Sequence, residues 1–264
     1  MNIIEAMKER RSVRTFDGLG LSKEQSSELE KAIERSDSPF GGSVTIKLKK
    51  FDLKEGYRPS TYGMIRGAED FFLLGIGGDE ASALSAGYRF EQVVLKAWQM
   101  GLGTCWIAAT FKGSDFDRGL ELPEGEELKV ICPVGTAEKP SIKEKLTRLT
   151  LGSKNRKPFN DLFFYENFNT AVPDDNKFRE ALEMLRIAPS STNSQPWRVL
   201  VEGDTVHFYY KPKSPASVLD CGIGICQFHE TEKFYGHDGD FSKVSGAPAP
   251  PEDWKYLVSY RRVR

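Results

Sequence analysis

The chain has few cysteines and no long apolar run, and each absence excludes a class of protein. Its four cysteines lie in apolar stretches, which is typical of buried thiols in a reducing compartment rather than of a secreted disulfide scaffold. The longest apolar stretches, around residues 71–78 and 102–110, fall well short of the roughly 20 residues that span a membrane. The first residues contain no signal-peptide core. We therefore expect a cytoplasmic protein that does not bind membranes.

The chain also lacks an excess of charge of either sign. Its 37 Lys and Arg residues are balanced by 38 Asp and Glu residues, which gives a formal net charge of -1. No global basic field is available to hold nucleic acid, so any anion must be bound by a local cluster of cations. With 264 residues, of which 39% are hydrophobic and 28% charged, the chain is typical of a globular protein with one large or two small domains.

The first half of the chain alternates helical and extended patterns. A capping box formed by Ser22 and Gln25 predicts the start of a helix that ends near Arg35. Other apolar patterns predict a helix before Arg10, strands over 44–48, 71–76, 104–108 and 128–134, and a long helix over 82–100. The strand at 71–76 shows no alternation of apolar and polar residues, so we expect it to be covered on both faces.

From residue 174 the same order of elements returns. The patterns predict a helix through Leu182, a loop at 188–196, a strand at 197–201, a tight turn at 202–205, a shorter helix at 221–234 and a last strand at 254–260. We interpret this as an internal duplication. The two halves are residues 1–166 and 167–264, with a bridge rich in Lys, Arg and Asn over 140–169.

Two motifs, one in each half, resemble the same protein family. Residues 9–16 read ERRSVRTF, which resembles the opening motif of the FMN-dependent nitroreductases. Residues 188–197 read APSSTNSQPW, which resembles the loop with which this family contacts the flavin ring. Further matches are GLGTCWIAA at 101–109, LPEGEE at 122–127 followed by CPVG at 132–135, and KNR at 154–156, where the family has a Lys-x-Arg segment.

The resemblance implies a fold and an assembly. The fold is an α+β, three-layer α/β/α nitroreductase-like fold, with mixed, mainly antiparallel sheets flanked by helices. Members of the family ordinarily form homodimers that bind each FMN between subunits, with the basic motif from one subunit and the Pro-Ser-x-x-Asn loop from the other. Here one chain carries both motifs, whereas SDSPFGG at 36–42 stands where the first half would have its ring loop. The chain is therefore similar to the single-chain, pseudo-dimeric branch of the family. We interpret it as a monomer that keeps one FMN site and has lost the other.

The resemblance also assigns residues to the cofactor. Those assigned to the phosphate and ribityl chain are Arg10, Arg11, Ser12, Lys154 and Arg156. Arg14 is assigned to N1 and O2 of the ring, where a cation favours the anionic reduced form. The backbones of Ala108 and Ala109 are assigned to N5 and O4. The residues expected to approach the ring from the second half are Pro189, Ser190, Ser191 and Asn193.

The implied activity is ping-pong hydride transfer. NADH or NADPH would reduce FMN at N5, and a small electron acceptor such as a nitroaromatic or a quinone would then reoxidise it. The cofactor carries this chemistry, so we assign no catalytic side chain. One alternative remains open, namely a flavin-binding redox sensor or binding protein without NAD(P)H turnover.

Three other patterns point to sites that we do not expect. Cys221, Cys226 and His229 lie close in sequence, but their C-x4-C spacing is not a usual zinc spacing and no second pair exists, so we predict no metal. The glycines at 75–78 and 101–103 do not complete a dinucleotide-binding fingerprint. The basic run at 10–14 has no interleaved aromatic residues, which argues against nucleic acid as its partner.

Overall fold

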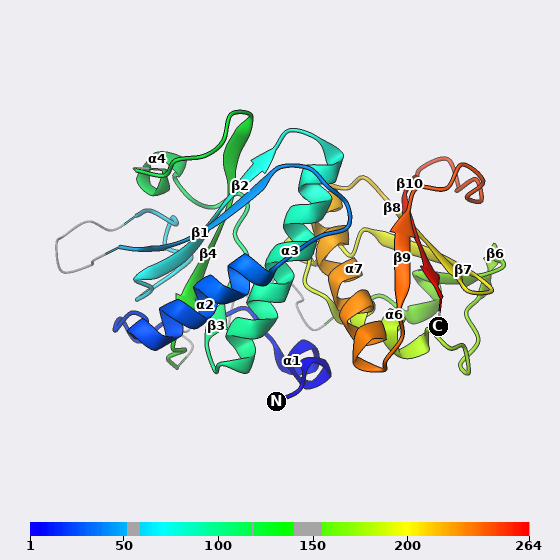
Figure 1. Cartoon of the computed structure of the whole chain (residues 1–264), viewed down its shortest axis with the longest axis horizontal. Coiled ribbons are helices and arrows are strands. Elements are labelled where there is room, and N and C mark those ends of the chain that lie inside the picture. Colours follow the sequence, from blue (N-terminus) through cyan, green and yellow to red (C-terminus); the bar gives the residue numbers. More distant parts are fainter. Residues whose placement is uncertain (52–58, 118, 140–154, 264) are drawn as a thin grey trace.

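The computed structural model describes residues 1–51, 59–117, 119–139 and 155–263, and it shows two sheets with a pair of helices between them (Figure 1). The first sheet has four strands, in the order β1 (Val44–Lys50), β2 (Asp70–Gly77), β4 (Glu126–Gly135) and β3 (Gly103–Thr104). The second has six, in the order β6 (Asn167–Ala171), β5 (Phe163–Tyr165), β7 (Trp197–Glu202), β8 (Thr205–Tyr210), β10 (Lys255–Arg262) and β9 (Gly239–Ser242). All pairs are antiparallel except β5 with β7. The predicted α+β class with mainly antiparallel sheets flanked by helices is confirmed.

The helices begin where the sequence supplies side-chain caps. The α-helices are α1 (Ile3–Glu9), α2 (Lys23–Arg35), α3 (Glu80–Gln99), α4 (Gly113–Phe116), α6 (Arg179–Ile187) and α7 (Ser217–Phe234), and two short 3-10 turns are η2 (Phe159–Asp161) and η3 (Ser191–Asn193). The predicted capping box at Ser22 and Gln25 opens α2, and Asn2 with Glu5 forms a second one at α1. Satisfying the first backbone N–H groups in this way sets the start of each helix.

Helices α3 and α7 form the middle layer, with one sheet on either side of the pair (Figure 1). They approach most closely at Gly87 and Gly222. A Cβ atom on Gly87 would lie 2.1 Å from the carbonyl oxygen of Leu219, and one on Gly222 would lie 2.2 Å from that of Leu84. Leu219 lies three positions before Gly222, and Leu84 lies three positions before Gly87, so the contact is reciprocal. Glycine is required at both positions because any side chain would overlap the other backbone.

The two sheets share one strand order. The order β1-β2-β4-β3 of the first sheet returns as β7-β8-β10-β9 in the second. Within each set of four strands, a long helix follows the second strand along the chain. Helix α3 connects β2 to β3, and α7 connects β8 to β9. The β2–β4 and β8–β10 pairs also each contain one register shift. The repeated order of elements that the sequence predicts is therefore present in the topology.

Three elements differ from the sequence predictions. The strand expected over 104–108 is only β3, followed by an isolated bridge between Ile107 and Ile131. The bridge expected over 140–169 contains core residues, because Phe163 is buried and its strand β5 pairs with β7. Helix α7 is shorter than α3, as expected, with 18 residues against 20, but it begins at Ser217, before the expected start at 221. Strand β5, with three residues, is too short to show a periodic pattern.

The hydrophobic core belongs to both halves. One cluster of buried side chains extends from Leu29 of α2 to Tyr260 of β10. All eight residues of β2 are buried, which confirms that this strand is covered on both faces. The four cysteines are buried as thiols. Within the described ranges, no helix is both long enough and apolar enough to cross a membrane.

Candidate functional site

The basic segment after α1 is held against the edge of the first sheet. The backbone N–H of Val13 donates to the carbonyl of Thr104 in β3 over 2.9 Å, and Ser12 forms a parallel bridge with the same residue. A Cβ atom on Gly103 would lie 2.6 Å from the side chain of Val13, so the glycine allows this close approach. One of the glycines in the 101–103 stretch therefore serves backbone packing.

Arg10 is the most deeply buried cation of this segment. Its side chain is 5% exposed, and its Nε lies 4.0 Å from Oε1 of Glu91 in α3. Among the described residues, neither Nε nor Nη1 of Arg10 has a hydrogen-bond partner. Guanidinium N–H groups that are buried without acceptors are costly, so this side chain is prepared to receive an anion.

Glu91 is the fixed counter-charge behind Arg10. Its carboxylate accepts a hydrogen bond from Nε2 of Gln227 in α7 over 2.7 Å and one from Nε1 of Trp106 over 3.2 Å. Complete burial raises the pKa of Glu91, while Arg10, Gln227 and Trp106 oppose that rise. The network joins α3, α7 and the segment after β3, and it fixes the position of Arg10 from behind.

A second, half-buried arginine comes from the segment that joins the two halves. Arg156 donates through Nη1 to Oδ1 of Asn193 over 2.6 Å and through Nη2 to the carbonyl of Ile187 over 2.8 Å. Burial, together with the positive charges of Arg10 and Arg186, lowers the pKa of Arg156 to about 10. A bound anion would relieve the repulsion between these two positive charges.

The loop between α6 and β7 has a strained backbone. Thr192, Asn193 and Gln195 all have positive φ angles, at 49°, 56° and 47°. Such angles cost energy for residues with a side chain, and they persist only where the surroundings hold the backbone. Strain of this kind is often found at functional sites.

Asp220, in the first turns of α7, anchors this loop. Its two carboxylate oxygens accept from the backbone N–H of Ser191 over 3.0 and 3.1 Å, and Ser194 Oγ donates to Oδ2 over 3.3 Å. The residue is 2% exposed. Burial raises the pKa of Asp220 to about 7, although the hydrogen bonds from Ser191 and Ser194 act against the rise.

The segment 155–157 holds the loop from the opposite side. Lys157 donates through Nζ to the carbonyls of Ser194 and Gln195 over 2.7 and 3.1 Å, and its backbone N–H donates to Oε1 of Gln195 over 2.8 Å. The carbonyl of Asn155 accepts from Nδ2 of Asn193 over 2.7 Å. Burial lowers the pKa of Lys157, with the nearby Lys213 as the next cause.

The residues expected at the site fall into two groups. Arg10, Arg156 and Asn193 are brought together, and Ser190 stays within the same loop by accepting from the N–H of Gln195 over 3.0 Å. Arg11, by contrast, is exposed, with its guanidinium 5.5 Å from the ring centroid of Trp98.

Other expected residues lie near the first sheet or outside the described part of the chain. Arg14 is half-buried, and its Nε has no hydrogen-bond partner within the described ranges. Ala108 and Ala109 are exposed directly after the Ile107 bridge. Pro189 and Ser191 are half-buried in the loop before β7. Lys154 lies outside the described residues.

Four residues that hold the site were not found by sequence reasoning: Glu91, Lys157, Asp220 and Gln227. Glu91 and Asp220 are acidic residues in otherwise apolar helical stretches, and that contrast was the available signal. The residues of the Cys and His pattern have other surroundings. Cys221 and Cys226 are buried thiols, and Nδ1 of His229 is 2.5 Å from the hydroxyl of Tyr88. No group of three or more His, Cys, Asp or Glu side chains in the described ranges could hold a metal ion.

A family model described as "Putative TM nitroreductase" matches residues 2–231. The chain belongs to this nitroreductase family. Its members are oxidoreductases, and the resemblance seen in the two motifs is thereby confirmed. No curated protein matches the sequence.

Comparison with solved structures shows the same fold in one protein and weaker similarity in two others. A crystal structure titled a "putative nitroreductase" from Thermotoga maritima has a TM-score of 0.65 and 18% identity, and the match covers 100% of this nitroreductase-family chain and 94% of that one. An FMN-dependent nitroreductase from Clostridium difficile R20291 has a TM-score of 0.44 and 18% identity, with 52% and 89% covered. A nitroreductase with bound FMN from Bacteroides fragilis has a TM-score of 0.43 and 14% identity, with 54% and 91% covered.

Proposed function

We propose that this chain is an FMN-dependent oxidoreductase that transfers hydride from NADH or NADPH to a small electron acceptor such as a nitroaromatic or a quinone. Arg10 carries the proposal. Its side chain is 5% exposed, and two of its nitrogen atoms have no hydrogen-bond partner in the described part of the chain. A dianionic phosphate would supply the missing acceptors, and Arg156 would share its charge.

Different residues of the chain suit the phosphate, the ribityl chain and the ring of FMN. Arg10, Ser12 and Arg156, with Lys154 from the sequence, would hold the phosphate and ribityl chain, and Arg11 would contribute from the rim. Arg14 would place a buried, unpartnered Nε beside the ring edge that becomes negative on reduction. When bound, FMN supplies hydride transfer through its N5 atom.

The ring would lie between backbone groups of both halves. The backbones of Ala108 and Ala109 are exposed at the end of the first sheet, and the loop with Pro189, Ser190, Ser191 and Asn193 would meet the opposite edge of the ring. Asp220 and Lys157 hold that loop in its strained form before any ligand arrives. Holding the contact groups in place beforehand lowers the entropy that binding must overcome.

We also propose that the chain acts as a monomer built like a dimer, in the cytoplasm, with one FMN between residues 1–166 and 167–264. The repeated strand order supports this proposal. The reciprocal contact of Gly87 and Gly222 supports it as well, because a residue pair that repeats itself across a contact is typical of a two-fold interface.

The first experiment is an absorbance spectrum of the purified protein, with the flavin released by heat and quantified against protein. We expect about one FMN per chain. Anaerobic NADH or NADPH should then bleach the flavin, and a quinone or a nitroaromatic should restore its colour. A protein that stays yellow with both nicotinamides contradicts turnover and identifies a flavin-binding protein instead. A colourless protein that takes up no FMN contradicts the cofactor itself.

A further inference from the structure

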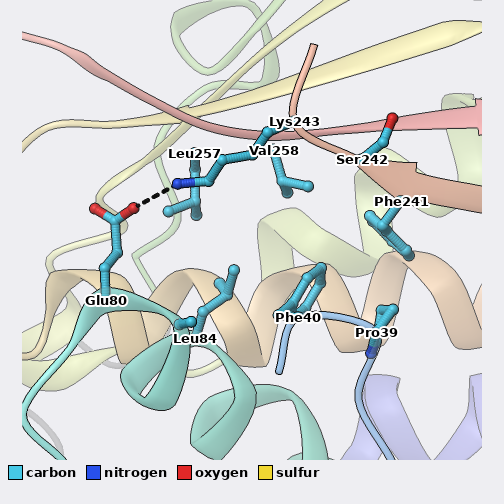
Figure 2. Close-up of a pocket in the computed structure, with 10 residues that line it drawn as sticks. Pro39, Phe40, Glu80, Leu84, Phe241, Ser242, Lys243, Leu257 and Val258 are labelled. Atoms are coloured by element: carbon cyan, nitrogen blue, oxygen red, sulfur yellow. Dashed lines mark hydrogen bonds and ion pairs between the residues drawn. The ribbon is translucent and has the colours of Figure 1, made fainter. Parts of the chain in front are cut away.

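A hollow of about 200 Å³ lies between the start of α3 and strands β9 and β10 (Figure 2). Figure 2 shows Leu84 and Phe40 pointing into it from the helix side, and Phe241, Leu257 and Val258 from the sheet side. An ion pair between Glu80 and Lys243 crosses the same space. The lining is thus mostly apolar, with one paired charge of each sign.

The hollow is lined by elements that correspond, in the repeated order, to elements around the candidate flavin site. Its walls come from the loop before β1, the first turns of α3, and strands β9 and β10. The candidate flavin site uses the loop before β7, the first turns of α7, and the region that follows β3. These are corresponding elements of the two sheets, because β1 and β9 take the places of β7 and β3 in the repeated order.

The chemistry of the hollow differs from that of the flavin site. Among the described residues that line it, Lys243 is the only cation, and its Nζ lies 3.2 Å from Oε1 of Glu80. Tyr210 also donates to Oε2 of Glu80 over 3.3 Å. No arginine stands in the part of the lining that the structure describes, so no residue there corresponds to Arg10 or Arg156. A phosphate would meet the Glu80 carboxylate, and its binding is therefore disfavoured. The paired charges favour a neutral ligand.

We propose that this hollow binds a neutral molecule with one aromatic ring and one hydroxyl group, a simple phenol. An apolar cavity of roughly 150 Å³ is known to hold benzene, so the volume here accommodates a ring with a substituent. The rings of Phe40 and Phe241 stand edge to face at 5.2 Å, which is an arrangement that a third ring can extend.

Glu80 supplies the polar end of the site. Each of its two carboxylate oxygens accepts one described hydrogen bond, from Lys243 and from Tyr210. A carboxylate offers about four acceptor positions, so a phenol hydroxyl can donate to it without displacing either partner. The lining shares no residue with the candidate flavin site, so the proposal stands independently of the proposed function.

The test is a titration with 4-methylphenol followed by amide NMR, with and without saturating FMN. We expect saturable shifts at Leu84, Phe241 and Val258 and a Kd of roughly 0.1–1 mM, which is the strength that a ligand of this size reaches in a partly open apolar site. FMN should not displace the phenol. Leu84→Phe, which fills the hollow, should weaken binding at least tenfold, while the exposed control Leu19→Phe should leave it unchanged.

A second variant keeps the test decisive if Leu84→Phe fails to fold. Glu80→Gln, at a half-exposed position, should weaken 4-methylphenol a few-fold and leave the binding of toluene unchanged. The proposal is overturned if no saturable shifts occur at about ten times the expected Kd, or if FMN competes with the phenol. It is also overturned if a folded Leu84→Phe binds as tightly as the original protein.

Discussion

The candidate flavin site and the phenol hollow have corresponding walls but opposite chemistry. The first contains Arg10 and Arg156 and a loop with three left-handed residues. The second contains an apolar lining and the pair of Glu80 and Lys243. Corresponding elements of one scaffold therefore carry arginines on one side and a mostly apolar hollow on the other. A few side chains, and not the arrangement of elements, decide what each side can bind.

The anchors of the two loops show the difference most directly. Asp220 lies two residues before Gly222 and holds the loop before β7. Ser85 lies two residues before Gly87, and its hydroxyl donates over 2.5 Å to the carbonyl of Gly41 in the loop before β1. A carboxylate can accept several N–H and O–H bonds at once, whereas a hydroxyl donates only one. The stronger anchor holds the loop with the more strained backbone.

The largest expected effect comes from removing both arginines of the candidate flavin site. Arg10→Ala with Arg156→Ala should weaken FMN binding by about a thousandfold, because two charge-assisted interactions of about 1.5–3 kcal/mol each are lost. A dialysis or fluorescence titration measures this. The control is Arg35→Ala, at the exposed end of α2. Unchanged FMN affinity in the double variant would remove the anion site and the contrast with the hollow.

The second prediction concerns the pH dependence that Asp220 introduces. Its pKa is raised to about 7 in the folded protein, from about 3.9 in an unfolded chain. Between these values the folded protein binds more protons, so the carboxyl contributes stability that is complete below about pH 4 and is lost as the pH rises to about 7. The full loss is about 4 kcal/mol.

Asp220→Asn cannot ionise, so this contribution disappears. The free energy of unfolding of the variant, minus that of the original protein, should therefore increase between pH 4.5 and pH 8 in urea titrations of the flavin-free protein. Ser85→Ala at the corresponding position removes no ionisable group, and its difference should stay constant with pH. A constant difference for Asp220→Asn as well would show that the two anchors are alike.

The third prediction tests the contact that relates the two halves. Gly87→Ala and Gly222→Ala should each lower the free energy of unfolding by about 1–3 kcal/mol, because each new methyl group meets backbone atoms at overlapping distance. The two effects should be similar. Their sum should exceed the effect of the double variant, because the first methyl group already moves the two helices apart at the contact that the second would disturb. Gly113→Ala is the matched control, a helical glycine with open space around it. Clearly unequal effects would break the proposed symmetry.

The smallest expected effect separates two neighbouring arginines. Arg11→Ala should weaken FMN binding by less than about fivefold, since this exposed side chain lies over the ring of Trp98 and an exposed cation is worth about 0–1 kcal/mol. Arg10→Ala alone should weaken FMN binding by at least tenfold in the same titration. Equal losses would place Arg11 beside the phosphate, as the sequence resemblance implies.

Helices and strands with strong periodic patterns were predicted well, and those with weak patterns were missed. Helices α2 and α3 and strands β1, β2, β4 and β7 lie where capping residues and apolar spacing place them. Strand β5 was missed because three residues show no period, and its place is decided by pairing with β7, far along the chain. Strand β9 was missed for a similar reason, since its four residues contain only one large apolar side chain, Phe241.

Only part of the candidate site, too, could be predicted from the sequence. Its two motifs stand in the sequence as continuous runs, and the family match bears out the resemblance they carry. The contact of Arg156 with Asn193 was not visible, because it joins segments 37 residues apart. The network of Glu91, Gln227 and Arg10 was hidden for the same reason, since it depends on how α3 and α7 cross.

The sequence by itself determined the class of fold, the repeated order of elements, the family and the two motifs, because each of these is written in local spacing of residue types. Only the tertiary structure decided which arginines are shielded from solvent and which partners they have. Only the tertiary structure also placed a mostly apolar hollow among the elements that correspond to those of the candidate flavin site. Burial and charge are properties of residues brought together from distant parts of a chain, and no local pattern contains them.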